Sequence, residues 1–367
     1  MPILEKAVIQ NWRNIELQEL EFSPNINCIS GNNGEGKTNL LDAIHCLSMS
    51  KSAFGSGDKW NYRRGTDFYA ISGTYLMHEG QQARFSIRSS AGEDKKLTRD
   101  GKAYTRISDH IGVLPIVMVS PGDTALVSDG SEERRRLVNA VLSQMDKEYL
   151  SDVQRYTRLL TNRNALLKSG RTDESVMETI DLRMDSLAGR IYNKRSELAQ
   201  TLEPVVARFY SQLSGGAESV GISYRSELEE APLLDLLRGA AAKDRQLGFT
   251  TCGVQRDDFI FTMNGDPIRK VGSQGQQKSF LVALKFAQYE IMKASYGFPP
   301  ALLLDDLFDK LDMTRVSNLL SMVASSDFGQ IFITDSNKVR IRGIVDGITA
   351  DRAYFEAAGG AFSKIDE

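Results

Sequence analysis

The sequence predicts an α/β fold in which a mixed sheet is flanked by helices and carries an inserted helical lobe. Two strand patterns and one helical pattern support this expectation. The apolar run Ile26 to Ile29 precedes a glycine-rich loop, after which apolar residues recur at helical spacing. The fully apolar run Ala301 to Leu304 predicts a buried parallel strand. A long helical region lies between these runs, so both ends of the chain contribute to the sheet.

The order of the elements defines the expected domains. The first fifty residues have the pattern strand, turn, strand, loop and helix, and strands dominate from residue 68 to residue 119. Apolar stripes at helical spacing then extend from Ser131 to the pair Gly215-Gly216. Strand character returns at Gly221 to Tyr224. We therefore expect a head formed by residues 1–130 and 221–367, and a helical lobe formed by residues 131–220.

Composition argues against several classes of protein. Of the 367 residues, 41% are hydrophobic and 25% are charged, which is typical of a globular protein. No apolar run reaches the roughly 20 residues that span a bilayer, so we expect a cytoplasmic protein without a membrane partner. The three cysteines, Cys28, Cys46 and Cys252, form no C-x-x-C pair, which argues against a zinc site or a disulfide framework.

A phosphate-binding loop follows the first apolar strand. Its eight residues match the pattern G-x-x-x-x-G-K-[ST] in full. Glycines let the backbone turn tightly, so that N–H groups converge on phosphates at the N-terminus of the next helix. Lys37 is expected to reach the β- and γ-phosphates, and the Thr38 hydroxyl to bind magnesium. The motif therefore predicts a site for ATP and Mg²⁺, formed by Gly31, Asn32, Asn33, Gly34, Glu35, Gly36, Lys37 and Thr38.

Two consecutive aspartates end the second apolar strand. Ligands bind at the carboxyl ends of parallel strands, which places Asp305 and Asp306 beside the phosphates. Asp305 is expected to orient magnesium, while Asp306 polarises the attacking water and Lys37 assists catalysis at the phosphates. A strand-end pair that only caps a turn is the alternative. Asp305 follows Thr38 by 267 residues, so a large segment separates the two halves of the site.

A second candidate anion site precedes the strand that carries the aspartates. The segment Val271 to Lys278 places a hydroxyl and glycines at the start of a helix, where N–H groups attract negative charge. One chain can hardly use two such sites on one ATP, so we expect a homodimer that assembles on ATP. In that dimer, Ser273 and Gly275 of one subunit cover the γ-phosphate held by the other.

At these landmarks the chain resembles the SMC and RecF group of ABC-type ATPases, over nearly its whole length. Asn11 to Asn14 is similar to the group's F-R-N stretch, and Gly31 to Ala43 is similar to its G-x-N-G-x-G-K-T-N-L-L-E-A stretch. The chain differs from the group's pattern at Gln255, which replaces a usual His, and at Asp42, which replaces a usual Glu; Ser52 to Gly55 lacks a usual arginine, and Ser120 to Asp123 matches its loop only loosely. The later landmarks are Arg256-Asp257-Asp258, Gly272 to Gln277, and Leu303 to Asp306.

The resemblance implies an ABC-type P-loop ATPase head with an inserted helical lobe, and a slow, DNA-stimulated hydrolysis of ATP that resets the dimer. It also implies a role in DNA repair, replication, recombination and the SOS response. The protein would bind gapped DNA or single-strand/double-strand junctions and help load a recombinase onto SSB-coated single strands, with mediators of the RecR and RecO type. Residues 310–312 would form a loop at the dimer interface. The nucleotide-binding residues added by the resemblance are Arg13, Asn14, Asn39, Ser273, Gln274, Gly275 and Gln276.

Positive charge is concentrated between Lys59 and Arg106, where ten Lys or Arg residues accompany five Asp or Glu residues. This excess suits a DNA phosphate backbone, and a solvated strand surface also explains it. Trp12 and Trp60 are expected to be packing groups, and Trp60, beside Arg63 and Arg64, is the better candidate for stacking on a base. An SMC-like structural head that clamps chromosomes is the alternative function, although it requires long heptad arms. The candidate DNA contacts are Arg63, Arg64, Lys95 and Lys96, together with Arg134 and Arg135, which local ion pairs would explain equally well.

Overall fold

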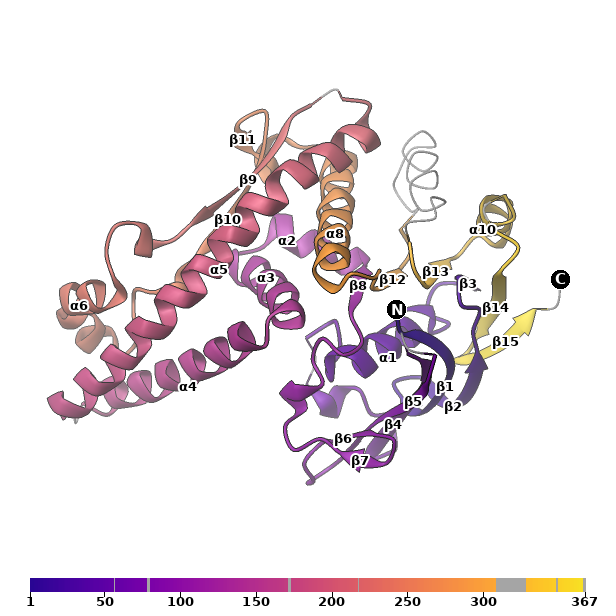
Figure 1. The fold of residues 1–367 in the computed structure, drawn as a ribbon, viewed down its shortest axis with the longest axis horizontal. Coiled ribbons are helices and arrows are strands. Elements are labelled where there is room, and N and C mark those ends of the chain that lie inside the picture. Colours follow the sequence, from indigo (N-terminus) through magenta and orange to yellow (C-terminus); the bar gives the residue numbers. More distant parts are fainter. Residues whose placement is uncertain are drawn as a thin grey trace. The chain divides into compact units, whose positions relative to one another are not determined.

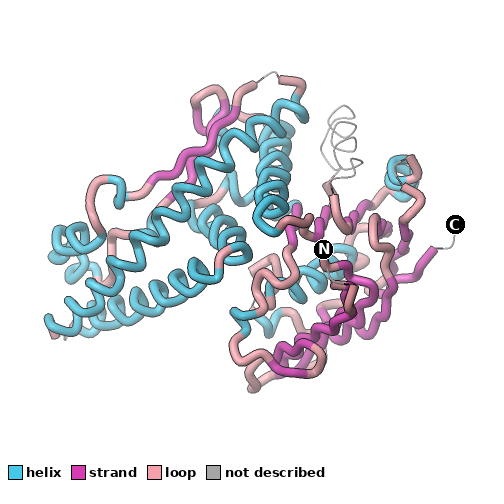
Figure 2. Tube along the Cα trace, viewed as in Figure 1, coloured by secondary structure: helices cyan, strands magenta, loops and turns pink. Residues whose placement is uncertain are grey.

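The structure is a computed structural model that describes residues 1–55, 57–77, 80–170, 173–216, 218–307, 328–347 and 349–365. The chain forms two compact units. One contains Met1–Asp123 together with Lys285–Glu367, and the other contains Thr124–Leu284. Figure 1 labels the elements of each unit, and Figure 2 shows that strands predominate in the first unit and helices in the second.

An antiparallel sheet in the first unit has the strand order β2-β1-β4-β5-β6-β7. Buried side chains alternate with more accessible ones along β4 and β5, as expected for strands with one face on a core. The turn Arg13-Asn14 joins β1 to β2, and Arg13 has a φ of 52°. The strands are β1 (Ile3–Trp12), β2 (Ile15–Glu21), β4 (Phe68–Leu76), β5 (Gln82–Ser90), β6 (Lys96–Arg99) and β7 (Lys102–Ala103).

A second sheet in the same unit has the order β15-β14-β3-β13-β12-β8 and carries the nucleotide motifs. All of its strands are parallel except β15, which is antiparallel to β14. Because parallel strands end at one edge, the ends of β3 and β12 bring the glycine-rich loop and Asp305 to the same edge. The strands are β3 (Ile26–Ser30), β8 (Ile116–Val119), β12 (Ala301–Leu304), β13 (Ile331–Asp335), β14 (Arg352–Ala358) and β15 (Ala361–Ile365).

Helix α1 (Lys37–Met49) follows the loop and buries the apolar stripe that the sequence predicts, including Leu40, Leu41 and Ile44. The first unit also contains α10 (Lys338–Val345), the short 3₁₀ helices η1 (Asp58–Trp60) and η2 (Ile107–Asp109), and all of η3 (Pro121–Thr124) except its last residue, which begins the second unit.

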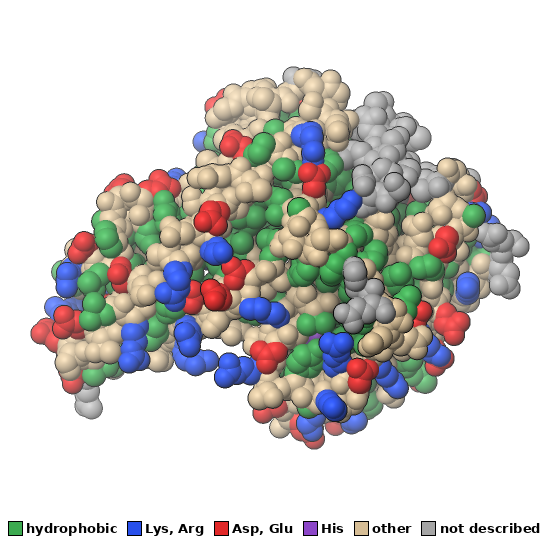
Figure 3. Space-filling view, in the orientation of Figure 1, with side chains coloured by type: hydrophobic (Ala, Val, Ile, Leu, Met, Phe, Trp, Pro, Cys, Tyr) green, Lys and Arg blue, Asp and Glu red, His purple; other side chains and the backbone are tan. Residues whose placement is uncertain are grey.

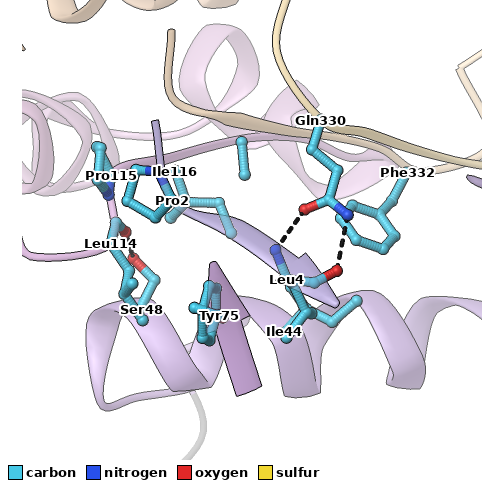
Figure 4. A pocket seen from close by; sticks show the side chains of 11 residues that line it. Pro2, Leu4, Ile44, Ser48, Tyr75, Leu114, Pro115, Ile116, Gln330 and Phe332 are labelled. Atoms are coloured by element: carbon cyan, nitrogen blue, oxygen red, sulfur yellow. Dashed lines mark hydrogen bonds between the residues drawn. The ribbon is translucent and has the colours of Figure 1, made fainter. Parts of the chain in front are cut away.

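Figure 4 shows a small pocket in the first unit, lined by side chains such as Leu4, Ile44 and Phe332. Gln330 closes one side of it by accepting a hydrogen bond from the Leu4 N–H and donating one to the Leu4 carbonyl, both at 2.8 Å. These bonds join the start of β13 to β1. None of the side chains that line the pocket is charged, so this pocket is not a candidate phosphate site.

The second unit is mainly helical. Its longest helix, α5, has 41 residues and packs against α4, α6 and β9. A three-stranded antiparallel sheet in the order β11-β10-β9 completes the unit, and α8 (Gln274–Tyr296) begins in it. The other elements are α2 (Ala125–Ser128), α3 (Ser131–Met145), α4 (Lys147–Ser169), α5 (Glu174–Ser214), β9 (Val220–Arg225), η4 (Glu227–Glu229), α6 (Leu233–Leu247), η5 (Val254–Arg256), β10 (Asp258–Met263), β11 (Asp266–Pro267) and α7 (Ile268–Val271).

This compact unit extends beyond the lobe of residues 131–220 expected from the sequence. Residues 221–284 group with the helices because β9 pairs with β10 and packs on α5. Side chains strengthen this grouping, since Arg195 of α5 forms an ion pair of 2.6 Å with Asp257. The strand pattern that suggested a return to the head therefore belongs to a separate small sheet.

Candidate nucleotide-binding site

The glycine-rich loop connects β3 to α1. Gly34 and Gly36 have φ values of 87° and 105°, a region that favours glycine. The Lys37 side chain is buried, and its Nζ donates hydrogen bonds to the carbonyl oxygens of Gly31 at 2.7 Å and Asn32 at 3.0 Å. The ammonium group therefore lies inside the loop, at the N-terminus of a 13-residue helix, where backbone N–H groups attract anions. The exposed part of the loop is Asn32, Asn33 and Gly34.

Thr38 and Asp305 meet beside this loop. The Thr38 Oγ1 lies 3.0 Å and 2.8 Å from the two carboxylate oxygens of Asp305. Oxygen ligands of this kind are those that Mg²⁺ prefers. Burial raises the pKa of the Asp305 carboxyl, and hydrogen bonds from Thr334 and Thr38 oppose that shift. The fold thus brings together the two residues predicted to bind magnesium.

Sequence reasoning missed Thr334, which lies in β13 and is fully buried. Its Oγ1 donates to Asp305 Oδ1 at 2.7 Å and accepts a hydrogen bond from the Asp306 N–H at 3.0 Å. Asp306 has a φ of 43°, a left-handed conformation that Asp adopts more readily than most residues. One hydroxyl group therefore fixes both aspartates. The available signal was a polar residue directly after the apolar run Ile331 to Ile333.

The turn Arg13-Asn14 contacts the loop and its helix. Asn14 Nδ2 donates to the Glu35 carbonyl at 3.3 Å, and Asn14 Oδ1 accepts from Asn39 Nδ2 at 2.7 Å. The Arg13 guanidinium forms an ion pair of 2.7 Å with the fully buried Asp42. Burial raises the pKa of Asp42, and the charge of Arg13 opposes this shift. These contacts brace the loop, while direct contact of Arg13, Asn14 and Asn39 with a nucleotide stays a prediction.

The predicted signature segment opens α8 in the second unit. The Ser273 N–H donates to Gln276 Oε1 at 2.7 Å, and the Gln276 N–H donates to Ser273 Oγ at 3.3 Å. This reciprocal cap satisfies donors at the start of the helix. The Gly275 carbonyl accepts from Ser279 Oγ at 2.9 Å, while Ser273 and Gln274 are exposed. Residues 310–312, expected at the dimer interface, lie outside the described residues.

Three of the candidate DNA contacts are accessible. Arg64 and Lys96 are exposed, and Arg63 is partly exposed in an ion pair of 2.7 Å with Glu16. Trp60 is 71% exposed, and the Lys59 ammonium lies 5.2 Å from the centre of its ring. Figure 3 shows Lys and Arg side chains interspersed with acidic ones on the visible face of the molecule.

The other three candidates are engaged within their own units. Lys95 is mostly buried and pairs with Asp58 at 2.8 Å. Arg134 is buried in an ion pair of 2.7 Å with Asp258, and Arg135 donates to the Asp257 carbonyl at 2.6 Å. A phosphate would have to displace these partners, and breaking a buried ion pair is costly. These contacts give the three side chains structural roles, while their contact with DNA stays a prediction, one that requires the buried ion pair of Arg134 to break.

The landmark that follows Gln255 also has a structural role. Gln255 accepts a hydrogen bond from the Tyr156 hydroxyl at 2.5 Å and donates one to the Cys252 carbonyl at 2.6 Å. Asp257 accepts from Arg195, and burial raises the pKa of its carboxyl. The neutral amide of Gln255 thus joins this segment to α4.

The parallel sheet, the phosphate loop, the paired aspartates and the signature helix define an ABC-type ATPase head. Residues 3–348 match the family described as RecF/RecN/SMC N terminal domain. The chain is 43% identical over 359 residues to the DNA replication and repair protein RecF of Porphyromonas gingivalis, covering 98% of this chain and 99% of that protein. It is 40% identical over 366 residues to the RecF protein of Bacteroides fragilis, covering 100% of this chain and 99% of that protein. The chain therefore belongs to the RecF family.

Solved structures agree with this assignment. The structure described as the recombination mediator protein RecF-ATP in the RecFOR pathway has a TM-score of 0.90 and 28% identity, covering 100% of this chain and 98% of that chain. The Smc head domain of Pyrococcus furiosus has a TM-score of 0.59 and 16% identity, covering 100% of this chain and 96% of that chain, so it shares the fold alone. Within the described ranges, no helix has the length and apolar character needed to cross a membrane.

Proposed function

We propose that this chain binds MgATP, dimerises on it, and binds DNA in recombinational repair. The observation that carries this proposal is the meeting of Thr38 and Asp305 beside the loop that encloses the Lys37 ammonium group. Magnesium ligands and a phosphate-binding cation at one edge of a parallel sheet are what an ATPase requires. Membership of the RecF family connects this site to DNA repair.

The residues present fit ATP and Mg²⁺. The N–H groups of the loop and Lys37 Nζ would hold the phosphates, and the oxygens of Thr38 and Asp305 would hold the metal ion. When bound, magnesium neutralises charge on the phosphate oxygens during hydrolysis. The Asp306 carboxylate, whose backbone is held by Thr334, would orient the attacking water and accept its proton. The proposed reaction is a slow, DNA-stimulated hydrolysis of ATP to ADP and phosphate.

A second copy of the chain would complete the site. The exposed residues Ser273 and Gln274 open a 23-residue helix, a position where N–H groups favour a negative charge. With Gly275 and Gln276, they would cover the γ-phosphate bound by the partner's loop. Hydrolysis removes the group that both subunits hold, so it would also separate the dimer.

The proposed DNA substrate is a gapped duplex or a single-strand/double-strand junction. Arg63, Arg64 and Lys96 would contribute positive charge, and Trp60 would contribute an aromatic ring for an unpaired base. The RecFOR pathway named for the similar structure supports mediators of the RecR and RecO type, with recombinase loading onto SSB-coated strands as the outcome. A protein acting on bacterial chromosomal DNA works in the cytoplasm, which we propose as the location of this chain.

Fluorescence anisotropy of a labelled gapped duplex, with ATP or ADP across a salt series, tests this function. We expect ATP to tighten binding and the logarithm of affinity to fall linearly with the logarithm of salt concentration. Trp12 is buried and Trp60 exposed, so quenching of tryptophan emission by DNA, absent in Trp60→Phe, would report contact at Trp60. Equal DNA affinity with either nucleotide would refute ATP-gated repair. ATP-gated binding to closed circular duplex, without preference for a gap, would favour the chromosome-clamp alternative.

A further inference from the structure

The phosphate loop is held at Glu35 by the hairpin of β14 and β15. The turn of this hairpin, Gly359-Gly360, has φ values of 58° and 87°. The Gly360 N–H donates to the Glu35 carbonyl oxygen at 2.9 Å, and the Gly359 N–H donates to the Glu35 carboxylate. The Glu35 carbonyl also accepts from Asn14 Nδ2 at 3.3 Å. Three segments that are distant in sequence therefore meet at one residue of the loop.

The hairpin packs closely against this region. A Cβ atom on Gly360 would lie 2.3 Å from the carbonyl oxygen of Asn14, and one on Gly31 would lie 2.6 Å from the carbonyl oxygen of Ala357. A Cβ atom on Gly359, in contrast, would meet no atom within 4 Å. Backbone therefore touches backbone at Gly360 and Gly31, so neither position accepts a side chain without displacing a neighbour.

Peptide geometry connects these contacts to phosphate binding. The peptide group between Glu35 and Gly36 is planar and trans, so its C=O and N–H point in opposite directions. Hydrogen bonds from Gly360 and Asn14 fix the direction of the carbonyl, and hence aim the Gly36 N–H to the opposite side. The N–H groups at the start of α1 are those that bind phosphates.

We propose that the β14–β15 hairpin is a latch that sets the conformation of the phosphate loop, with Glu35 and Gly360 as positioning residues. This inference rests on the proposed binding of ATP to the loop. The hydrogen bond from Gly359 attaches the Glu35 side chain to the hairpin, as a second connection beside the bond from Gly360 to the Glu35 carbonyl. ATP affinity therefore depends on a hairpin near the other end of the sequence.

Gly360→Ala and Gly359→Ala form a matched pair for testing the latch. Both replace a glycine of positive φ in the same turn, and only the first introduces a clash. We expect Gly360→Ala to weaken ATP binding about tenfold, as the loss of one hydrogen bond would, while Gly359→Ala stays within about twofold of the unmodified chain. Isothermal titration measures the affinity, and hydrogen exchange at the Gly36 amide should accelerate in Gly360→Ala alone. Equal affinities and exchange rates in the two variants would overturn the latch, and failure of the unmodified chain to bind ATP would overturn the proposed function as well.

Glu35→Ala and Glu35→Gln keep the test decisive if Gly360→Ala does not fold. A Gln side chain retains the acceptor for the Gly359 N–H, whereas Ala removes it. We expect Glu35→Ala to weaken ATP binding about threefold to tenfold and Glu35→Gln to restore it, with similar unfolding temperatures for both. If Glu35 contributed only to overall stability, the two variants would not differ in ATP affinity. Equal ATP affinity in them would contradict the latch.

Discussion

Thr334→Val tests how the two aspartates of the site are held. The substitution preserves the size of a fully buried side chain and removes its hydroxyl group. Asp305 loses the hydrogen bond of 2.7 Å from Thr334, and the Asp306 N–H loses its acceptor at 3.0 Å. Asp305 keeps its contacts with Thr38, so its carboxylate is held by fewer hydrogen bonds but still has a partner.

The expected magnitude follows from these two bonds. A neutral hydrogen bond such as that of the part-buried Asp306 N–H contributes about 0.5–1.5 kcal/mol, and a hydrogen bond to a charged group contributes about 1.5–3 kcal/mol. Since Thr38 compensates in part at Asp305, we expect Thr334→Val to lower the free energy of unfolding by about 2–4 kcal/mol. Asp306 also has a left-handed backbone that only its surroundings maintain, so its carboxylate should lose its fixed direction.

The pKa of Asp305 determines how this penalty depends on pH. Burial already raises the pKa of this carboxyl, and the hydrogen bond from Thr334 acts against that shift. Removing the bond raises the pKa further and disfavours the ionised form in the folded state. The stability penalty should therefore be largest above the folded-state pKa and should shrink as pH falls through it. For the same reason, the Mg²⁺ dependence of ATP binding should weaken on acidification at a higher pH in the variant.

Urea unfolding followed by tryptophan emission measures the stability, because Trp12 and Trp60 both lie in the unit that contains Thr334. Titration of a fluorescent ATP analogue at several Mg²⁺ concentrations measures the effect on the metal. Thr334→Ser is the control, since it retains the hydroxyl group and loses only a methyl group. Val and Ser variants that match in stability and in Mg²⁺ dependence would refute the role of the hydroxyl group.

Four further changes test the site and the roles of charged residues. Lys37→Ala should weaken ATP binding at least about 100-fold by calorimetry, because the phosphates lose a charge-assisted donor; near-normal affinity would move the site. Asp306→Asn should retain ATP binding and slow phosphate release about 100-fold or more, whereas unchanged turnover would place the base elsewhere. Ser273→Arg should abolish ATP-dependent dimers in sedimentation without weakening ATP binding by the monomer, and persistent dimers would contradict the shared site. Arg134→Ala should lower stability by about 3 kcal/mol because Asp258 loses its nearest charged partner and keeps only the Arg225 guanidinium at 3.8 Å, with no change in the salt dependence of DNA binding; the reverse result would support Arg134 as a DNA contact.

The part of the site that could be predicted from the sequence consists of residues that are close together in the chain. A phosphate loop requires glycines, a lysine such as Lys37 and a hydroxyl such as that of Thr38 within a few consecutive residues between a strand and a helix. The sequence motif alone therefore predicts its chemistry. The same holds for Asp305, which directly follows a fully apolar strand.

Register and strand order place the remaining site residues, and neither is a local property. Thr334 reaches the aspartates because β13 lies between β3 and β12 in the sheet. Gly360 reaches Glu35 because β14 pairs with β3 in a register that aligns Glu356 with Ser30. A one-residue shift of that register would move the hairpin turn away from the loop. Periodicity indicates which faces are buried, whereas these contacts also require knowledge of which strands are neighbours.

The roles of charged residues also depend on the fold, and a count along the sequence does not reveal them. A count of Lys and Arg along the chain treats Arg64 and Arg134 as equivalent, although Arg64 is exposed and Arg134 is buried with its partner 124 residues away. Desolvating an unpaired guanidinium is unfavourable, so a buried arginine implies an acid that the fold supplies, here Asp258. The landmark Arg256-Asp257-Asp258 therefore combines two properties, a recognisable family pattern and buried carboxylates that pair with α3 and α5. The motif therefore contributes to the packing of the second unit, and its presence alone does not locate the DNA-binding surface.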